Sequence, residues 1–253
     1  MNLNRKIIIF GASSDIAKPI ISKLSKDNEL ICISRSQLLY ENTKNITLEN
    51  YSDNLIDLIS NMELDNEKVS AINFIGSMIL KPLHLLKENE MLEIMDVNFM
   101  TNYRILSQIL KKNLSDLNYI AFSSVAANYG LANHEAIASA KAANEGLIRS
   151  CASSYGHKSY KFNCIAPSLI ETKLTSRIVG TEAGRKAVEN MNPLKKIGSP
   201  EDLSECITWL LSDNSNFVTG QTINIGGGLN LSLIHISEPT RRTPISYAVF
   251  CLK

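Results

Sequence analysis

The sequence predicts an α/β fold: one doubly wound parallel sheet with helices on both faces. Two observations predict it. Short apolar runs rich in Ile, Val and Phe recur along the chain, and each leads into a segment with helical spacing. Strands that are apolar along their whole length are typical of parallel sheets buried on both sides. With about seven strands and no internal repeat or linker, residues 1–230 are expected to form a single Rossmann-like domain.

The N-terminal elements follow one another closely. The run KIIIF (6–10) predicts a strand closed by glycine, and SDIAKPIISKLSKDN (14–28) follows with apolar residues at helical spacing. ELICIS (29–34) predicts a second strand. After a polar connection, the amphipathic stretch YSDNLIDLISNM (51–62) predicts a helix, and VSAINFIG (69–76) predicts a third strand.

The second half of the domain repeats this alternation. Its expected strands are the apolar runs 118–124, 160–168 and 220–228. Residues 88–114 form a long stretch with helical spacing, and the Ala-rich residues 134–156 predict another helix. PEDLSECITWLLSD (200–213) opens with proline and two acids, which are residue types that favour the first turn of a helix.

Composition restricts the function classes. With 44% hydrophobic and 20% charged residues among 253, the chain has the make-up of a globular protein with a sizeable core. A formal net charge of +1 gives no indication of nucleic-acid or acidic-membrane binding. The five cysteines are scattered without a CxxC pair, which argues against a metal site or disulfide scaffold and for a reducing compartment. No apolar run approaches the ~20 residues that cross a bilayer, and the N-terminal run is too short for a signal peptide, so a cytoplasmic protein is expected.

Residues 231–253 break the pattern. They contain two prolines and an arginine pair, and they continue no βα alternation. The segment can be interpreted as an oligomer-contacting tail or as a disordered end. It also resembles the translated read-through of a sequencing-library adapter. We therefore expect a non-native or disordered tail and leave it out of the functional argument.

A candidate nucleotide site follows the first strand. A strand, a glycine turn and a helix N-terminus together favour phosphate binding, because free N–H groups and the positive helix end face the anion. The stretch IIIFGASSDIAKPI has this layout. The residues expected to contact a cofactor there are Gly11, Ser13, Ser14, Asp15 and Ile16.

Taken together, residues 5–230 resemble the short-chain dehydrogenase/reductase family, in particular its 3-oxoacyl-carrier-protein-reductase-like members. The family's TGxxxGxG turn corresponds here to Phe10, Gly11, Asp15 and Ala17, so only the first glycine is kept. Alanine at the last position is a mild change, since that position serves close helix–strand packing. Asp15 adds a negative charge where the pyrophosphate is expected to lie, although Ser14 or Asp15 can instead cap the helix. The resemblance implies dinucleotide binding that Asp15 weakens.

The resemblance also implies which residues surround the adenosine half of the cofactor. The motif NFIG supplies Asn73 and Gly76, which match the family's adenine-pocket motif. After the second strand, Ser34 and Arg35 offer a hydroxyl and a guanidinium that suit a 2′-phosphate. NADP(H) is therefore expected rather than NAD(H). The alternative is that Arg35 is a solvated loop residue.

At the nicotinamide half, the resemblance implies a catalytic trio. Ser124 matches the substrate-orienting serine, Lys141 the catalytic lysine, and Asn98 the asparagine that helps to hold a proton-relay water. The residues expected to flank the nicotinamide are Lys141, Pro167, Ile170 and Thr172. Residues 174–198 are expected to form a lid over the substrate, whose identity the sequence does not indicate.

The family's proton donor is a tyrosine four residues before the lysine, and this chain has Ile137 there. In the family the lysine ammonium lowers the tyrosine pKa from near ~10, so that the phenol can protonate the carbonyl oxygen. His134 and Tyr129 are candidate substitutes, although a surface histidine and a packed loop aromatic are the simpler interpretations. The sequence thus favours a nicotinamide-dependent reductase of ketones or secondary alcohols with altered acid chemistry. The alternative is a non-catalytic nucleotide-binding or oligomer-partner protein. A homo-oligomer, tetramer or dimer, is expected from the resemblance.

Overall fold

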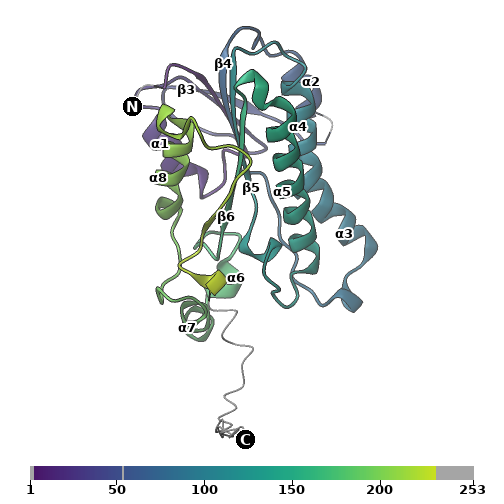
Figure 1. Ribbon diagram of the computed structural model, residues 1–253. Helices are drawn as coiled ribbons and strands as arrows, with labels where there is room; N and C mark the ends of the chain where they lie inside the picture. Colours follow the sequence, from purple (N-terminus) through teal and green to yellow (C-terminus); the bar gives the residue numbers. More distant parts are fainter. Residues whose placement is uncertain (1–2, 53, 232–253) are drawn as a thin grey trace, which may run out of the picture.

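The computed structural model describes residues 3–52 and 54–231 (Figure 1). In this part of the chain, parallel strands form one sheet in the order β3-β2-β1-β4-β5-β6-β7. They are β1 (Lys6–Phe10), β2 (Leu30–Ser34), β3 (Thr43–Thr47), β4 (Lys68–Asn73), β5 (Asp116–Phe122), β6 (Lys161–Pro167) and β7 (Thr222–Ile225). The strand order reverses at β1 and β4, which places a switch point where these two strands end. The doubly wound parallel sheet predicted from the sequence is confirmed.

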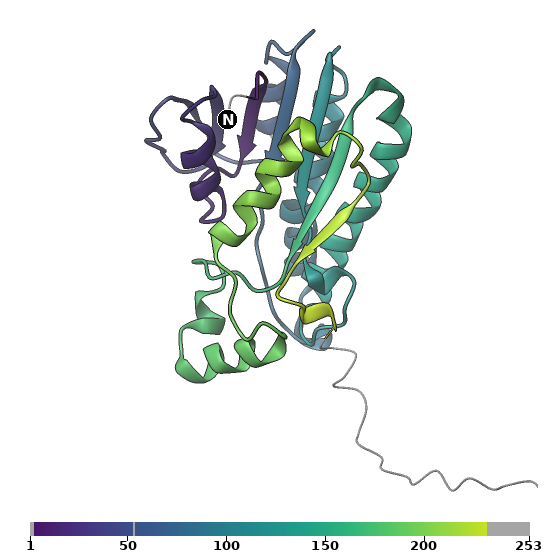
Figure 2. The same ribbon diagram turned by 60° about the vertical axis from the view of Figure 1, so that its left-hand side comes forward.

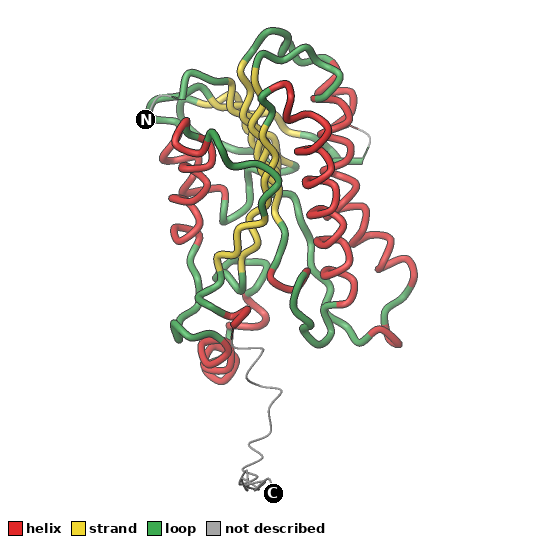
Figure 3. Tube along the Cα trace, in the orientation of Figure 1, coloured by secondary structure: helices red, strands yellow, loops and turns green. Residues whose placement is uncertain are grey.

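Helices cover both faces of the sheet, as Figures 1 and 3 show. One face packs against α1 (Ala17–Leu24) and α8 (Pro200–Leu211). The other packs against α2 (Asn54–Ser60), α4 (Thr101–Ile109) and α5 (Glu135–Tyr155). Successive residues of β1 alternate between two buried clusters, because neighbouring side chains of a strand point to opposite faces. This two-sided burial explains the continuously apolar strand sequences.

The helix predicted over residues 88–114 is interrupted. It is built from α3 (Glu88–Met95), a π-helical turn η2 (Asp96–Met100) and α4. Three side chains in succession donate to the carbonyl four residues earlier: Asn98 to Ile94 at 3.1 Å, Thr101 to Val97 at 2.8 Å and Asn102 to Asn98 at 3.2 Å. Such bonds compete with the backbone ladder, which accounts for the widened turn.

Two segments contain elements that the residue pattern does not predict. The polar connection after β2 contains β3, an edge strand whose sequence TKNIT carries no apolar run. The expected lid, residues 174–198, contains the helices α6 (Ser176–Val179) and α7 (Glu182–Met191). Figure 2 shows both beyond the carboxyl end of the sheet.

The predicted tail, residues 231–253, lies outside the described residues except for Leu231. Over the described ranges, none of the helices combines the length and the apolar character required to cross a bilayer.

Candidate functional site

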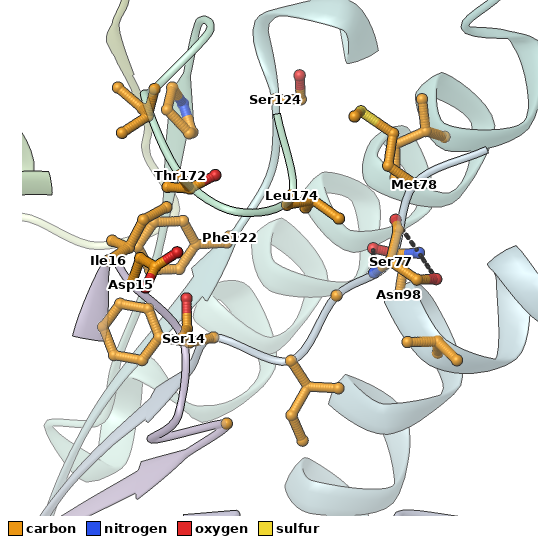
Figure 4. Close-up of a pocket in the computed structure, with 18 of the residues that line it drawn as sticks. Ser14, Asp15, Ile16, Ser77, Met78, Asn98, Phe122, Ser124, Thr172 and Leu174 are labelled. Atoms are coloured by element: carbon orange, nitrogen blue, oxygen red, sulfur yellow. Dashed lines mark hydrogen bonds between the residues drawn. The ribbon is translucent and has the colours of Figure 1, made fainter. Parts of the chain in front are cut away.

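A cavity of about 430 Å³ opens at the carboxyl ends of β1, β4, β5 and β6. Phe10 at the end of β1 pairs with Ile33 of β2 and with Asn73 of β4, so the loops after these strands emerge side by side. In Figure 4, Ser14, Asp15 and Ile16 lie on one side of the cavity, and Ser77, Met78 and Asn98 lie on the other. Most of the predicted site residues line it: Gly11, Ser13, Ser14, Asp15, Ile16, Arg35, Gly76, Asn98, Ser124, Ile137, Lys141, Pro167, Ile170 and Thr172.

The loop after β1 requires glycine at its first position. Gly11 has φ +72°, and a Cβ there would lie 2.8 Å from the Ile75 nitrogen and 2.9 Å from the Phe74 carbonyl carbon. The close approach of these two loops therefore excludes any side chain. The N-cap of α1 is Ile16, and it makes no side-chain capping bond. No capping side chain therefore competes with an anion at the start of this helix, although the Ala17 N–H is bonded to the Ser14 carbonyl at 3.0 Å and Pro19 has no N–H.

Asp15 does not cap α1, contrary to one of the two roles expected for it. Its carboxylate accepts hydrogen bonds from the Lys18 ammonium at 2.7 Å and from the Lys173 amide at 2.8 Å. Burial alone would raise the pKa of this carboxyl, but the hydrogen bonds and charges of Lys18 and Lys173 hold it below its ordinary value. Lys18 belongs to α1, whereas the Lys173 amide belongs to the loop after β6, which also carries Thr172 into the cavity lining. Figure 4 shows Asp15 and Thr172 on the same side of the cavity.

At the end of the cavity next to β2, Arg35 lies over the ring of Tyr51, with 5.3 Å between the guanidinium carbon and the ring centroid. Both residues line the cavity, and burial raises the pKa of Tyr51. A cation held on an aromatic face is pre-oriented, which lowers the cost of ordering it around a phosphate. Ser34 is turned away from the cavity: it is fully buried, and its Oγ accepts from the Ser36 amide at 2.9 Å.

Lys141 projects from α5 into the other end of the cavity. It is 8% exposed, and its Nζ donates to the Phe122 carbonyl at 3.1 Å. Burial lowers the pKa of this ammonium to about 8. Ser124 begins a short 3-10 turn, η3 (Val125–Ala127), and its Oγ accepts from the Ala126 amide at 3.2 Å. The serine, the lysine and the loop after β1 thus share one cavity.

Ile137 lies one helical turn before Lys141 and is 6% exposed. It packs in an apolar cluster with Ile94, Ala136 and Ala140. The two candidate substitutes for a proton donor lie elsewhere, since neither is among the residues that line the cavity. His134 is half-buried and its Nδ1 lies 2.8 Å from the Ala132 carbonyl oxygen, whereas the Tyr129 hydroxyl lies 3.5 Å from the Asn230 amide nitrogen.

Behind the cavity, asparagines form a buried network. The Asn98 side chain is held by Ser77, to whose carbonyl its Nδ2 donates at 3.0 Å (Figure 4). The Asn98 carbonyl accepts from Asn102 at 3.2 Å and from Asn144 at 2.8 Å. Asn73, expected at the adenine pocket, donates to Asn102 at 2.9 Å and is buried in this network instead.

Three polar residues near the site were not singled out from the sequence. Asn144 and Glu145 are buried on α5, and Ser123 lines the cavity beside Ser124. On a helix with an alternating polar pattern, such residues resemble a solvated face. The sequence signal that could have identified Asn144 and Glu145 is their spacing, because positions 141, 144, 145 and 148 lie on one face of a helix.

Comparison with known proteins agrees with this arrangement. Residues 64–230 match the family model described as Enoyl-(Acyl carrier protein) reductase. A short-chain type dehydrogenase/reductase from Mycobacterium ulcerans superposes with a TM-score of 0.80 at 21% identity, covering 90% of each chain. The chain belongs to the short-chain dehydrogenase/reductase family. It is therefore a member of a family of nicotinamide-dependent oxidoreductases.

Other short-chain dehydrogenases and reductases resemble the whole described domain. The 3-oxoacyl-[acyl-carrier-protein] reductase FabG of Rickettsia prowazekii is 26% identical over 234 residues, which are 88% of this chain and 95% of that protein. The aldohexose dehydrogenase of Thermoplasma acidophilum superposes with a TM-score of 0.80 at 23% identity, covering 96% of this chain and 97% of the other. The family's fold thus extends over nearly all of the described residues of this short-chain dehydrogenase/reductase.

Proposed function

We propose that the protein transfers hydride between NADP(H) and a ketone or secondary alcohol. The observation that carries this proposal is the convergence of the Gly11 loop, Arg35, Ser124 and Lys141 on one cavity. The residues present fit a dinucleotide: the N-terminus of α1 suits a pyrophosphate, and Arg35 on Tyr51 suits a 2′-phosphate. Bound nicotinamide supplies or accepts the hydride. Ser13, Ser14 and Ile16 would contact the pyrophosphate, and Pro167, Ile170 and Thr172 would flank the nicotinamide.

The preference for NADP(H) rests on Arg35. Solved structures with similar folds hold either cofactor: ElxO has been solved with NADP bound, and 4-hydroxyisoleucine dehydrogenase in complex with NADH. They superpose with TM-scores of 0.79 at 20% and 22% identity, so they support the fold alone. The preference between NADP(H) and NAD(H) is therefore argued from the residues of this chain. In this chain a guanidinium, rather than a carboxylate, follows β2.

We propose Lys141 as the proton donor for carbonyl reduction, acting directly or through water. A carbonyl that accepts hydride needs a proton on oxygen, and Ile137 has none to give. Burial brings the pKa of Lys141 to about 8, so its ammonium is an acid in the range where a general acid works best. Ser124, on the same cavity, would orient the carbonyl. His134 and Tyr129 are outside the cavity lining, which favours the lysine over both.

The packing of Ile137 against Ile94 and Ala140 favours one alternative, a non-catalytic nucleotide-binding or oligomer-partner protein. Titration of the full chain with NADPH and NADH, followed by nicotinamide fluorescence, separates the two functions. We expect NADPH to bind more tightly than NADH, and a panel of ketones to be reduced. The reduction rate should fall as the pH rises through about 8, because Lys141 then loses its proton. Absence of binding would refute the proposal, and binding without turnover would favour the alternative.

Restoring a phenol tests the acid chemistry. Ile137→Tyr would place a hydroxyl one turn from Lys141, and a positioned general acid contributes on the order of 10²–10⁴ in rate. We expect ketone reduction to rise at least ~10-fold in this variant. Ile137→Phe is the matched control, since it adds the ring without the hydroxyl. An equal gain in both variants would assign the effect to packing rather than to proton transfer.

A further inference from the structure

A buried carboxylate, Glu145, lies behind the catalytic serine. Glu145 is 3% exposed and projects from α5. It accepts a hydrogen bond from Ser123 Oγ at 2.6 Å, and its two oxygens accept from Asn128 Nδ2 at 2.9 Å and 3.0 Å. The Arg149 guanidinium lies 3.6 Å away on the solvent side. Each of these partners is a donor, so the carboxylate acts here as an acceptor.

These partners enclose the turn that carries Ser124. Ser123 comes directly before Ser124, and Asn128 is the C-cap residue of η3, whose N-cap is Ser124 itself. A single carboxylate therefore holds the residues on both sides of the turn. A buried acceptor with charge-assisted bonds restrains such a turn more strongly than neutral pairs do.

The same helix also carries Lys141, one turn earlier. The Lys141 Nζ binds the carbonyl of Phe122, and the Lys141 carbonyl lies 3.4 Å from Ser123 Oγ. The side chains of Lys141 and Glu145 on α5 thus bind two consecutive residues, Phe122 and Ser123. We infer that Glu145 is a positioning residue that fixes Ser124 relative to Lys141. This inference rests on the proposed function of that pair.

Glu145 is not among the residues that line the cavity, so it does not reach a substrate directly. It acts through Ser123 and Asn128. Misplacement of a catalytic group by about 1 Å can cost on the order of 10²-fold in rate. Loss of the carboxylate should therefore lower kcat while leaving cofactor affinity unchanged.

Two substitutions of Glu145 by residues of similar size distinguish the loss of its hydrogen-bond acceptors from the loss of its negative charge. Glu145→Gln keeps an oxygen for Asn128 and offers an amide to Ser123, whose hydroxyl can then donate to the Lys141 carbonyl. Glu145→Leu keeps the volume and leaves both partners without an acceptor. Arg149→Met is the control that removes only the solvent-side ion pair. We expect Glu145→Leu to lose about 10- to 100-fold in kcat with NADPH Kd within about 2-fold of the parent, and Glu145→Gln to retain most of the activity.

Hydrogen exchange of the η3 amides gives a readout independent of turnover. The Ala127 amide donates to the Ser124 carbonyl, and the Tyr129 amide donates to the Val125 carbonyl. Both should exchange faster in Glu145→Leu than in Glu145→Gln, with amides of β5 unchanged. Equal protection in the two variants would overturn the inference even if the parent protein shows no turnover, an outcome that would by itself count only against the proposed function. Loss of activity in Glu145→Gln with η3 still protected would also overturn it, because the carboxylate would then be needed for proton transfer.

Discussion

Lys141 is a cation that the fold buries at a cost. Its folded-state pKa of about 8 lies below the ordinary value of 10.5 because burial disfavours the charged form. Between these two values the unfolded chain holds a proton that the folded chain has released. Stability therefore rises with pH across this window. Below about pH 8 both states are protonated and the full cost is present.

Removal of this charge is expected to stabilise the protein. Lys141→Met keeps the chain length and should gain about 1–3 kcal/mol at pH 7, which corresponds to several degrees in Tm. The gain should shrink as the pH approaches 10, and ketone reduction should be abolished. Thermal melts at pH 7 and pH 10 measure it, with the exposed Lys44→Met as control. A Lys141→Met variant less stable than the parent at pH 7 would contradict the assigned cost.

At the scale of elements, Asp15 connects two loops that are far apart in the chain. Its bond to the Lys173 amide joins the loop after β1 to the loop after β6, which carries Thr172 and Leu174 into the cavity lining. The negative charge expected to weaken dinucleotide binding is thus engaged by two donors. We propose that this bond helps to hold the second loop across a bound cofactor.

Loss of the Asp15 acceptor should speed cofactor release. Asp15→Ala is expected to raise the NADPH dissociation rate about 5-fold, the equivalent of one hydrogen bond of about 1 kcal/mol. Asp15→Asn keeps an oxygen for the Lys173 amide and should stay near the parent value. Lys18→Met removes the salt bridge alone and serves as control. Stopped-flow displacement of NADPH gives the rates, and equal rates in Asp15→Ala and Asp15→Asn would contradict the role of this bond.

The sequence predicted the elements whose signal is local. Apolar strands and the long α5 follow from periodicity, because burial on two faces or one face leaves a direct trace in the residue pattern. β3 left no such trace, since it is a polar edge strand. α6 has only four residues, and α7 mixes charged residues with small and apolar ones. The π-helical turn η2 arises from three side-chain bonds to backbone carbonyls, which hydrophobic spacing does not report.

The same distinction separates the site residues. Gly11 was expected from the strand–glycine–helix layout, whereas Ser124 and Lys141 were expected from the family motifs that the chain resembles. Ser34 and Asn73 were expected around the adenosine half of the cofactor, but hydrogen bonds with Ser36 and Asn102 turn their side chains into the protein. Glu145 was missed because its partners, Ser123 and Asn128, come from a different segment of the chain.

At the scale of the whole molecule, apolar side chains remain exposed on α3 and α4. Leu92 and Tyr103 are 62% and 50% exposed, and Leu83 and Leu85 are exposed nearby in the chain. Exposed large apolar side chains are available for protein–protein contacts. We propose that the protein is a homo-oligomer, a tetramer or a dimer, and that this side takes part in assembly.

Light scattering of the full chain checks the assembly. We expect the mass of a dimer or a tetramer, and a shift to smaller species in a Leu92→Glu, Tyr103→Glu double variant, because two charges would be buried in the contact. Phe217 is an exposed apolar residue outside these helices. The Phe217→Glu variant therefore tests whether a charge at an unrelated exposed apolar position has the same effect. A monomeric parent protein would refute the proposal.

Because several buried hydrogen bonds depend on α5, the gene tolerates substitutions in this helix better than changes in its length. Lys141, Asn144 and Glu145 all meet their partners from one face of this helix. Each residue of a helix is rotated by about 100° from the one before it. A substitution on α5 removes one contact at a time. Insertion or deletion of a single codon just before Lys141 would instead rotate the lysine, the asparagine and the glutamate together relative to the start of the helix, and one between positions 141 and 145 would take them off their common face. Length variation within this segment should therefore be absent from any working variant selected from a library, even where its amino acids change freely.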